Sequence, residues 1–302
     1  MRPPETGSKS AEVSDGAANP WLSRRVLSYA HQGGAWEAPS STLFAIRRAL
    51  ELGASGIELD VHATADRELV VCHDRTVDRT TDGHGPIHAL TLEELRSLDN
   101  AYWFVAGGDE QQGLPPEAYR FRGRAPAERD FCIATLDEVL DLLDDHPDVA
   151  INLDIKATAP AVEPYEELLA RALRRHDRSD RVIVASFLDL ATEAFRGFAP
   201  DVATSAGTIA VAEFWRAVHE EREPPAMRHL VLQVPAVQGD LVVVDEGFVE
   251  VAHRCGLAVH VWTVNDEKQM ARLCDLGVDG IVSDLPSTLV RILADRDLEY
   301  RP

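Results

Sequence analysis

The sequence has few cysteines and no long apolar run. Its four cysteines show neither CxxC spacing nor a histidine at zinc-finger distance, so we expect free thiols: Cys72, Cys132, Cys255 and Cys274. No apolar stretch reaches the roughly 18 residues that a membrane-spanning helix needs. Residues 1–20 carry no apolar segment of the kind that secretory signals contain. These absences predict a cytoplasmic protein without a transmembrane segment.

Positive charge is also scarce. Lys and Arg total 30 against 51 Asp and Glu, which leaves a formal net charge of −21. So acidic a chain is poorly suited to bind nucleic acid or an anionic membrane surface by electrostatic attraction. An anionic substrate would therefore require a local reversal of charge, and a bound divalent cation is the simplest way to provide it. Composition does not specify an oligomeric state.

The chain of 302 residues suits one barrel domain of about 250 residues with little left over. Residues 1–20 are polar and aperiodic, which predicts a disordered tail before a single domain over residues 21–302. Within that domain, short apolar runs alternate eight times with helical patterns, which favours an α/β fold, a (β/α)8 TIM barrel. The expected strands are Val26–Ala30, Ser55–Val61, Val149–Lys156, Arg181–Ser186, Val202–Ser205, His229–Val234, Ala258–Thr263 and Gly280–Ser283. The expected helices are Thr42–Leu52, Leu136–Leu143, Tyr165–Arg175, Leu188–Phe198, Ala210–His219, Glu246–Cys255, Glu267–Leu276 and Ser287–Ala294.

One segment interrupts this alternation, between the second and third expected strands. It holds a predicted hairpin at Glu68–His73, a short helix at Leu92–Leu98 and an irregular insertion at about residues 100–130. Functional loops of a barrel lie at the carboxyl ends of its strands, so we expect this insertion to cap the active site. Its apolar cluster, Tyr102–Phe104, is interpreted as a small packing core, with a substrate or membrane contact as the alternative.

Paired charged residues occur on two of the expected strands. Glu58 and Asp60 lie two residues apart, so both side chains face the same side, as do Asp154 and Lys156. Buried carboxylates need partners, and their hard oxygen atoms suit one divalent cation, Mg²⁺ or Ca²⁺. Solvated strand-end acids and a simple Asp154–Lys156 salt bridge are the alternatives. In the functional interpretation, Asp154 joins the metal ligands and Lys156 contacts a phosphate oxygen.

Two histidines follow apolar strand-like runs. His31 and His73 would leave their strands where a barrel places its catalytic groups. Imidazole titrates near neutral pH and can take a proton from a nucleophile or give one to a leaving group. Other histidines, including His62 and His260, are interpreted as surface or structural, although His62 shares the strand face of Glu58 by spacing.

Several stretches together resemble the glycerophosphodiester phosphodiesterase family. They are His31-Gln-Gly33, Gly56-Ile-Glu-Leu-Asp-Val61, His73-Asp74 leading into Asp78-Arg-Thr-Thr-Asp-Gly83, Val259-His-Val-Trp-Thr-Val-Asn265 and Gly277-Val-Asp-Gly-Ile-Val-Ser-Asp-Leu-Pro286. The resemblance covers nearly everything from about residue 26 to residue 293. It implies a barrel with one divalent ion, in which a glycerol hydroxyl attacks the phosphorus atom and water opens the resulting cyclic phosphate. It assigns His31 and His73 as the acid–base pair, Glu58, Asp60 and Asp154 as metal ligands, and Gln32, Lys156 and Trp262 as substrate-binding residues.

Three departures from the family pattern leave the substrate open. Gln32 stands where the family usually has arginine, Ser40 and Ser41 replace a usual Glu-Asn pair, and Asp154 replaces a usual glutamate. The Asp-x-Lys pairing also resembles sphingomyelinase D and phospholipase D toxins. Hydrolysis of a water-soluble glycerophosphodiester is therefore one hypothesis. A lysophospholipase D-like activity on a lipid is the second, favoured by any apolar surface near Trp103 that could contact a membrane transiently. A barrel that binds phosphodiesters without turnover is the third.

Overall fold

The computed structural model describes residues 19–22, 25–156 and 165–300. The predicted disordered tail, residues 1–20, lies outside these ranges except for its last two residues, and its disorder stays a prediction. Asn19 anchors the start of the described chain, because its side-chain amide donates hydrogen bonds to the carbonyls of Leu230 and Gly256. No helix in the described residues is long and apolar enough to cross a membrane.

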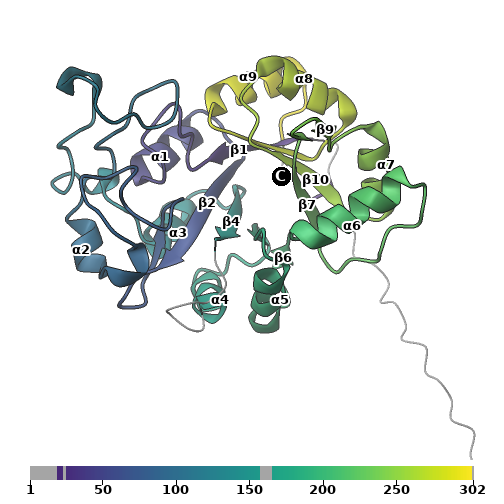
Figure 1. The fold of residues 1–302 in the computed structure, drawn as a ribbon, viewed down its shortest axis with the longest axis horizontal. Helices are drawn as coiled ribbons and strands as arrows, with labels where there is room; N and C mark the ends of the chain where they lie inside the picture. The colour runs from purple at the N-terminus through teal and green to yellow at the C-terminus, as the bar shows by residue number, and fades with distance from the viewer. Residues whose placement is uncertain (1–18, 23–24, 157–164, 301–302) are drawn as a thin grey trace, which may run out of the picture.

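Eight parallel strands form the barrel at the centre of Figure 1, in the order β6-β5-β4-β2-β1-β11-β10-β7. A parallel bridge between Ser205 and Val231 brings β6 next to β7 and closes the ring. The (β/α)8 barrel predicted from the alternation of patterns is therefore confirmed. The strands are β1 (Leu27–His31), β2 (Gly56–Ala63), β4 (Ala150–Ile155), β5 (Val182–Ala185), β6 (Ala203–Thr204), β7 (Val231–Pro235), β10 (Ala258–Trp262) and β11 (Gly280–Ser283).

Helices surround the strands on the outside of the ring (Figure 1). They are α1 (Leu43–Glu51), α3 (Leu136–Asp144), α4 (Tyr165–Arg175), α5 (Asp189–Phe198), α6 (Thr208–His219), α7 (Glu246–Arg254), α8 (Glu267–Leu276) and α9 (Pro286–Asp295). Local caps fix several starts, such as the reciprocal hydrogen bonds of Thr135 and Glu138 at α3. The start of α6 was predicted too late, at Ala210. Its first amides are capped from α5 by the Asp189 carboxylate, which local sequence cannot reveal.

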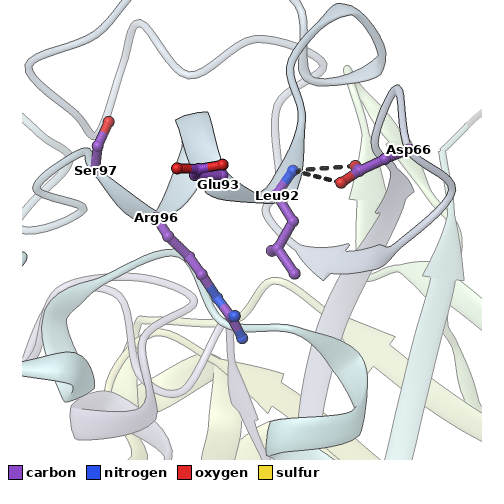
Figure 2. A pocket seen from close by; sticks show the side chains of 5 residues that line it. All are labelled: Asp66, Leu92, Glu93, Arg96 and Ser97. Carbon is purple, nitrogen blue, oxygen red and sulfur yellow. Dashed lines mark hydrogen bonds between the residues drawn. The ribbon is translucent and has the colours of Figure 1, made fainter.

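The segment between β2 and β4 begins with β3 (Leu69–Val71), which pairs antiparallel with β2 and confirms the predicted hairpin. The short helix α2 (Leu92–Arg96) follows, and three 3₁₀ turns lie at Ile87–Ala89, Pro116–Ala118 and Arg129–Phe131. Figure 2 shows the Asp66 carboxylate accepting hydrogen bonds from the Leu92 amide at the start of α2. The cavity of about 480 Å³ beside it is lined by no predicted site residue.

The aromatic residues of the insertion form a packing core. Phe104 is buried and its ring lies 5.7 Å from that of Phe121, which stacks on Phe131 at 5.3 Å. Phe44 of α1 joins this cluster, and the Trp103 indole donates to the Thr81 carbonyl. Phe104 therefore packs inside the insertion, as interpreted from the sequence, whereas Tyr102 and Trp103 are half-buried and the contact considered for a lipid stays a prediction.

A small hairpin after β7 was not predicted. It consists of β8 (Val237–Gln238) and β9 (Leu241–Val242), joined through Gly239, whose φ is +59°. Both strands are exposed and only two residues long, so they carry no periodic apolar signal. This hairpin stands at the carboxyl ends of the barrel strands and forms part of the rim described below.

The interior of the barrel changes from apolar to charged along the strands. Towards their amino ends, Leu27, Tyr29, Ile183 and Val282 pack together with Trp21 from the start of the domain. Because side chains alternate along a strand, the inward face of β1 continues from Tyr29 to His31 and that of β2 runs through Glu58 and Asp60. The side chains of His31, Glu58 and Asp60 therefore project into the carboxyl end of the barrel.

His260 lies in the middle layer of this interior and gives a pH-dependent prediction. It is fully buried against Tyr29, and neither ring nitrogen has a hydrogen-bond partner among the described residues. Burial lowers its pKa to about 4, so the folded protein resists a proton that the unfolded chain accepts below about pH 6.5. The free energy of unfolding should therefore fall as the pH drops through that window, by about 3 kcal/mol near pH 4.

The measurement is denaturant unfolding of the wild type and His260→Leu at neutral and acid pH. We expect the two proteins to differ in pH dependence, with the variant losing less stability on acidification. Equal losses would show that His260 does not contribute to acid sensitivity.

Candidate active site

The His31 side chain at the end of β1 is held by a carboxylate from the opposite end of the chain. Its Nδ1 lies 2.6 Å from Oδ1 of Asp284, which follows β11. The other Asp284 oxygen accepts from the side-chain amide of Asn265 at 2.6 Å, and the Asn265 carbonyl oxygen accepts from the Asp284 amide. This network fixes the ring so that Nε2 points towards Glu58, whose Oε2 is 3.7 Å away.

The turn after β1 depends on left-handed backbone geometry. Gln32 and Gly33 have φ angles of +52° and +83°. A Cβ atom on Gly33 would lie 2.8 Å from Cβ of Ala45, so glycine lets α1 pack directly against the turn. Gln32 is buried and its Nε2 lies 3.1 Å from Nε2 of His31. The residue predicted to grip phosphate therefore contacts a predicted catalytic residue, and its role in substrate binding stays a prediction.

His73 has an equivalent carboxylate support on the other side of the site. Its Nδ1 lies 2.7 Å from Oδ1 of Asp74, and the second Asp74 oxygen accepts from Nε of Arg79 at 2.7 Å. The rings of His31 and His73 lie edge to face with centroids 6.2 Å apart. His62, interpreted as structural from the sequence, has Nε2 3.3 Å from the His73 carbonyl oxygen. The two predicted acid–base groups thus share one site.

Lys156 bridges two of the predicted metal ligands. Its Nζ lies 2.7 Å from Oδ1 of Asp60 and 2.8 Å from Oδ2 of Asp154. The salt bridge considered as an alternative for Asp154 is therefore present, and it extends to Asp60 on the neighbouring strand β2, where the two aspartates are register partners. Ion pairing raises the pKa of Lys156 against the opposing effect of burial, so the ammonium group stays charged.

Glu58 carries the least compensated negative charge of the site. Burial and the neighbouring Asp60 raise its pKa well above the usual range for a carboxyl group. Burial would lower the pKa of His31, but the carboxylates of Glu58 and Asp284 outweigh it and raise that pKa. The carboxyl groups of Glu58, Asp60, Asp154 and Asp284 thus outnumber the two cationic groups that they face, the Lys156 ammonium and the His31 imidazolium.

A divalent cation fits this excess of negative charge. Oδ2 of Asp60 and Oδ1 of Asp154 are buried and have no hydrogen-bond partner among the described residues. Hard carboxylate oxygens of this kind are the ligands that Mg²⁺ and Ca²⁺ prefer. The three predicted ligands nevertheless gather less tightly than expected. In the described chain, a set of three ligand atoms within 4.8 Å of one another occurs only at Asp141, Asp144 and His176, outside the barrel mouth.

The site opens into a cavity of about 940 Å³. One end carries polar groups: His31, Glu58, His73, Asn152, Asp154 and Lys156. The other end is mainly apolar and lies under α6 and the β8–β9 hairpin, with Phe187, Val211, Trp215, Leu241 and Val243 in its walls. Trp262, predicted to contact substrate, lines the cavity and meets the Phe187 ring edge to face at 5.3 Å.

The structure brings the predicted site residues to one barrel mouth and adds supporting residues that sequence reasoning missed. Asp74, Asn265 and Asp284 belong to the stretches that carried the family resemblance, so a signal for them was present. Arg79 also lies in such a stretch. Glu110 of the insertion, which contacts Arg79, had no signal in the sequence.

Two imidazoles supported by carboxylates can move protons around a phosphoryl group, and a lysine beside them can hold its negative charge. On this fold they define a barrel enzyme of the phosphoric diester hydrolase class. The chain belongs to the glycerophosphoryl diester phosphodiesterase family, whose model matches residues 31–288.

Individual relatives agree with this assignment. A glycerophosphodiester phosphodiesterase of Caldanaerobacter subterraneus subsp. tengcongensis is 33% identical over 275 residues, covering 89% of this chain and 98% of the relative. Among solved structures, a phosphodiesterase of Oleispira antarctica in complex with the product sn-glycerol-3-phosphate superposes with a TM-score of 0.68 at 24% identity, covering 89% of this chain and 97% of that one. A Silicibacter pomeroyi protein described as a glycerophosphoryl diester phosphodiesterase superposes with a TM-score of 0.72 at 24% identity, covering 94% and 100%. At these identities the structural matches establish the fold alone.

Proposed function

We propose that this protein hydrolyses glycerophosphodiesters to glycerol phosphate and an alcohol in a reaction that depends on a divalent cation. The observation that supports this most directly is the pair of facing imidazoles, 6.2 Å apart between centroids and each held at Nδ1 by an aspartate. Each ring therefore turns its Nε2 away from its aspartate, and at His31 the substrate takes the place of the Gln32 amide, whose Nε2 lies 3.1 Å from Nε2 of His31. The similarity to named glycerophosphodiester phosphodiesterases supports the glycerol-containing substrate.

In this proposal the carboxylates Glu58, Asp60 and Asp154 hold the cation, which when bound stabilises the negative charge of the phosphoryl oxygens. Lys156 lies at the polar end of the cavity and adds a positive charge for the same oxygens. Trp262 and Phe187 form the wall against which the rest of the substrate lies. Gln32 contacts His31 and acts on the substrate through that ring.

The two histidines share the proton transfers. One Nε2 removes the proton from the glycerol hydroxyl beside the phosphodiester, the hydroxyl oxygen attacks phosphorus, and the other imidazole protonates the departing alcohol oxygen. A cyclic phosphate remains, and water opens it with the two rings in exchanged roles. The raised pKa of His31 favours this residue as the first proton donor. Oε1 of Gln32 has no hydrogen-bond partner among the described residues, and a rotation of the side-chain amide by 180° would let it accept from the His31 imidazolium.

The experiment is turnover of sn-glycero-3-phosphocholine, compared with an analogue that lacks the hydroxyl next to the phosphodiester. We expect choline release from the first only, with a cyclic phosphate visible by ³¹P NMR. Equal turnover of the analogue would exclude attack by the hydroxyl. Folded, cation-loaded protein that turns over no diester would favour the alternative of a barrel that only binds phosphodiesters.

The apolar end of the cavity favours a lysolipid as a second candidate substrate. Phe187 and Leu241 line it and are also 52% and 43% exposed at its rim. Leu188, Ile209 and Val242 extend this exposed apolar rim over the same side of the barrel. An acyl chain could lie there while the phosphodiester reaches the histidines. This rim is an apolar contact surface formed by other residues than the one considered near Trp103.

Leu241→Asp tests the second candidate. Turnover of lysophosphatidylcholine should fall roughly tenfold or more, because burying a leucine against a chain contributes about 1.5–3 kcal/mol. Turnover of glycerophosphocholine should be unchanged. Leu190→Asp is the matched control, since Leu190 is 78% exposed on α5 and does not line the cavity. If Leu241→Asp lowered the turnover of lysophosphatidylcholine and of glycerophosphocholine equally, this result would argue against an acyl-chain site.

A further inference from the structure

Glu110 is an unusual residue for a surface insertion because its carboxylate is buried. The side chain is only 5% exposed and forms an ion pair with Nη1 of Arg79. Its Oε1 accepts a hydrogen bond of 2.9 Å from Oγ of Ser40, which lies 70 positions earlier in the chain. Burying a carboxylate is costly unless it is paired, and here both oxygens have partners.

Arg79 connects this carboxylate to the catalytic site. Its Nε donates to Asp74 at 2.7 Å, and Asp74 in turn holds Nδ1 of His73 at 2.7 Å. Burial would lower the pKa of Arg79, but Glu110 and Asp74 outweigh it and raise it. The hydrogen bonds from His73 and Arg79 hold the pKa of Asp74 well below its usual range. Each neighbouring pair in the series Glu110–Arg79–Asp74–His73 is therefore joined by an ion pair or a hydrogen bond.

The position of Glu110 also bears on the serine at position 40, one of the three departures from the family pattern. The resemblance drawn from the sequence implies a glutamate at position 40, where this chain has Ser40, so that this position carries no acidic side chain. The structure places the Glu110 carboxylate against the Ser40 hydroxyl, so the insertion supplies an acid at the place that α1's preceding loop lacks. We infer that Glu110 is a positioning residue for His73, acting through Arg79 and Asp74 in place of that missing acid.

The physical reason is the freedom of Arg79. A guanidinium with partners on both sides has one orientation, and its Nε then meets Asp74 along a fixed direction. Without Glu110, one side of a half-buried guanidinium loses its partner, and the side chain can rotate away from Asp74. The Asp74 carboxylate and the His73 ring then gain freedom, so the proton is transferred less often in the correct geometry.

The test compares Glu110→Gln with Glu117→Gln, which removes the same charge from an exposed position of the same insertion. This inference rests on the proposed function, so turnover of glycerophosphocholine is the first readout. We expect kcat of Glu110→Gln to fall about tenfold with little change in KM, as when a partner that orients a histidine is removed. Glu117→Gln should match the wild type. An unchanged kcat in Glu110→Gln would overturn the inference.

A charge swap separates positioning from general destabilisation. The double variant Ser40→Glu with Glu110→Ser returns the acid to the loop before α1 and should regain most of the lost kcat. If the double variant has the wild-type melting temperature but a kcat as low as that of Glu110→Gln, then an acid at position 40 cannot take the role of Glu110 and the inference is overturned.

Nuclear magnetic resonance gives a readout that does not need turnover. The side-chain ¹⁵N signals of His73 should shift in Glu110→Gln and not in Glu117→Gln, because only the former loosens the Nδ1 contact. If the protein turned over no glycerophosphodiester while these signals still shifted, the proposed function would fail and the positioning role would stand. Identical His73 signals in both variants would refute the positioning role.

Discussion

His31→Asn and His73→Asn are each expected to lower kcat for glycerophosphocholine by about 10²–10⁴-fold, the usual contribution of a positioned acid or base. Asparagine keeps a polar group of limited size but cannot carry the proton. Because each ring is bound at Nδ1 by an aspartate, the proton has to pass through Nε2, and removing that nitrogen ends the transfer. Steady-state kinetics on folded variants provides the measurement.

His84→Asn is the matched control, since the His84 side chain is 86% exposed and lies outside the cavity. Cation binding should persist in both active-site variants, because neither histidine is a proposed ligand. Near-full activity of His31→Asn or His73→Asn would remove that residue from the acid–base pair.

Removal of the divalent cation is expected to abolish turnover, and added Mg²⁺ or Ca²⁺ should restore it. A metal that stabilises phosphoryl charge contributes several kcal/mol, which corresponds to about a thousandfold in rate. Glu58→Gln should weaken cation binding measured by equilibrium dialysis. Full activity after exhaustive chelation would contradict the proposed dependence.

Glu58→Gln is also expected to change the melting temperature of the metal-free protein. Burial raises the pKa of Glu58, so the folded state disfavours its charged form, and that cost grows as the pH rises towards the folded pKa. A neutral glutamine avoids it. Glu58→Gln should therefore raise the melting temperature of the metal-free protein near neutral pH, while reducing the increase that added cation produces. A lower melting temperature without metal would show that Glu58 is already well compensated.

A second cluster of potential metal ligands provides a control for the proposed cation site. Asp141, Asp144 and His176 hold three potential ligand atoms within 4.8 Å of one another near the protein surface. Asp141→Asn should leave turnover and its cation dependence unchanged, since these residues lie outside the catalytic cavity. If Asp141→Asn removed the cation dependence instead, the functional ion would belong to this cluster.

Local sequence rules were sufficient for the barrel and for much of the site. Each expected strand exists because an apolar run of suitable length is buried on both faces of a parallel ring. The period of two placed Glu58 with Asp60, and Asp154 with Lys156, on inward faces. The end of β1 places His31 at the carboxyl mouth of the barrel, whereas His73 reaches the same mouth because the antiparallel strand β3 folds back along β2.

What sequence could not supply depends on contacts between distant segments. Lys156 reaches Asp60 because β2 and β4 are neighbours in a register that no local pattern encodes. Gln32 bends towards His31 rather than the cavity because of the left-handed turn in which it lies. Glu110 meets Ser40 and Arg79 only once the insertion folds back over α1. The apolar rim was missed because its residues come from three separate segments, the loop before α5, the start of α6 and β9.

The barrel wall is not equally bonded around its circumference. On the catalytic side, β1, β2, β4 and β11 share continuous ladders, whereas β6 has two residues and meets β7 through a single bridge. The weakest seam therefore runs beside the apolar end of the cavity. Separating β6 from β7 would break the backbone hydrogen bonds from Leu230 to Thr204 and from Ala206 to Val231, and none of the contacts that hold His31 and His73.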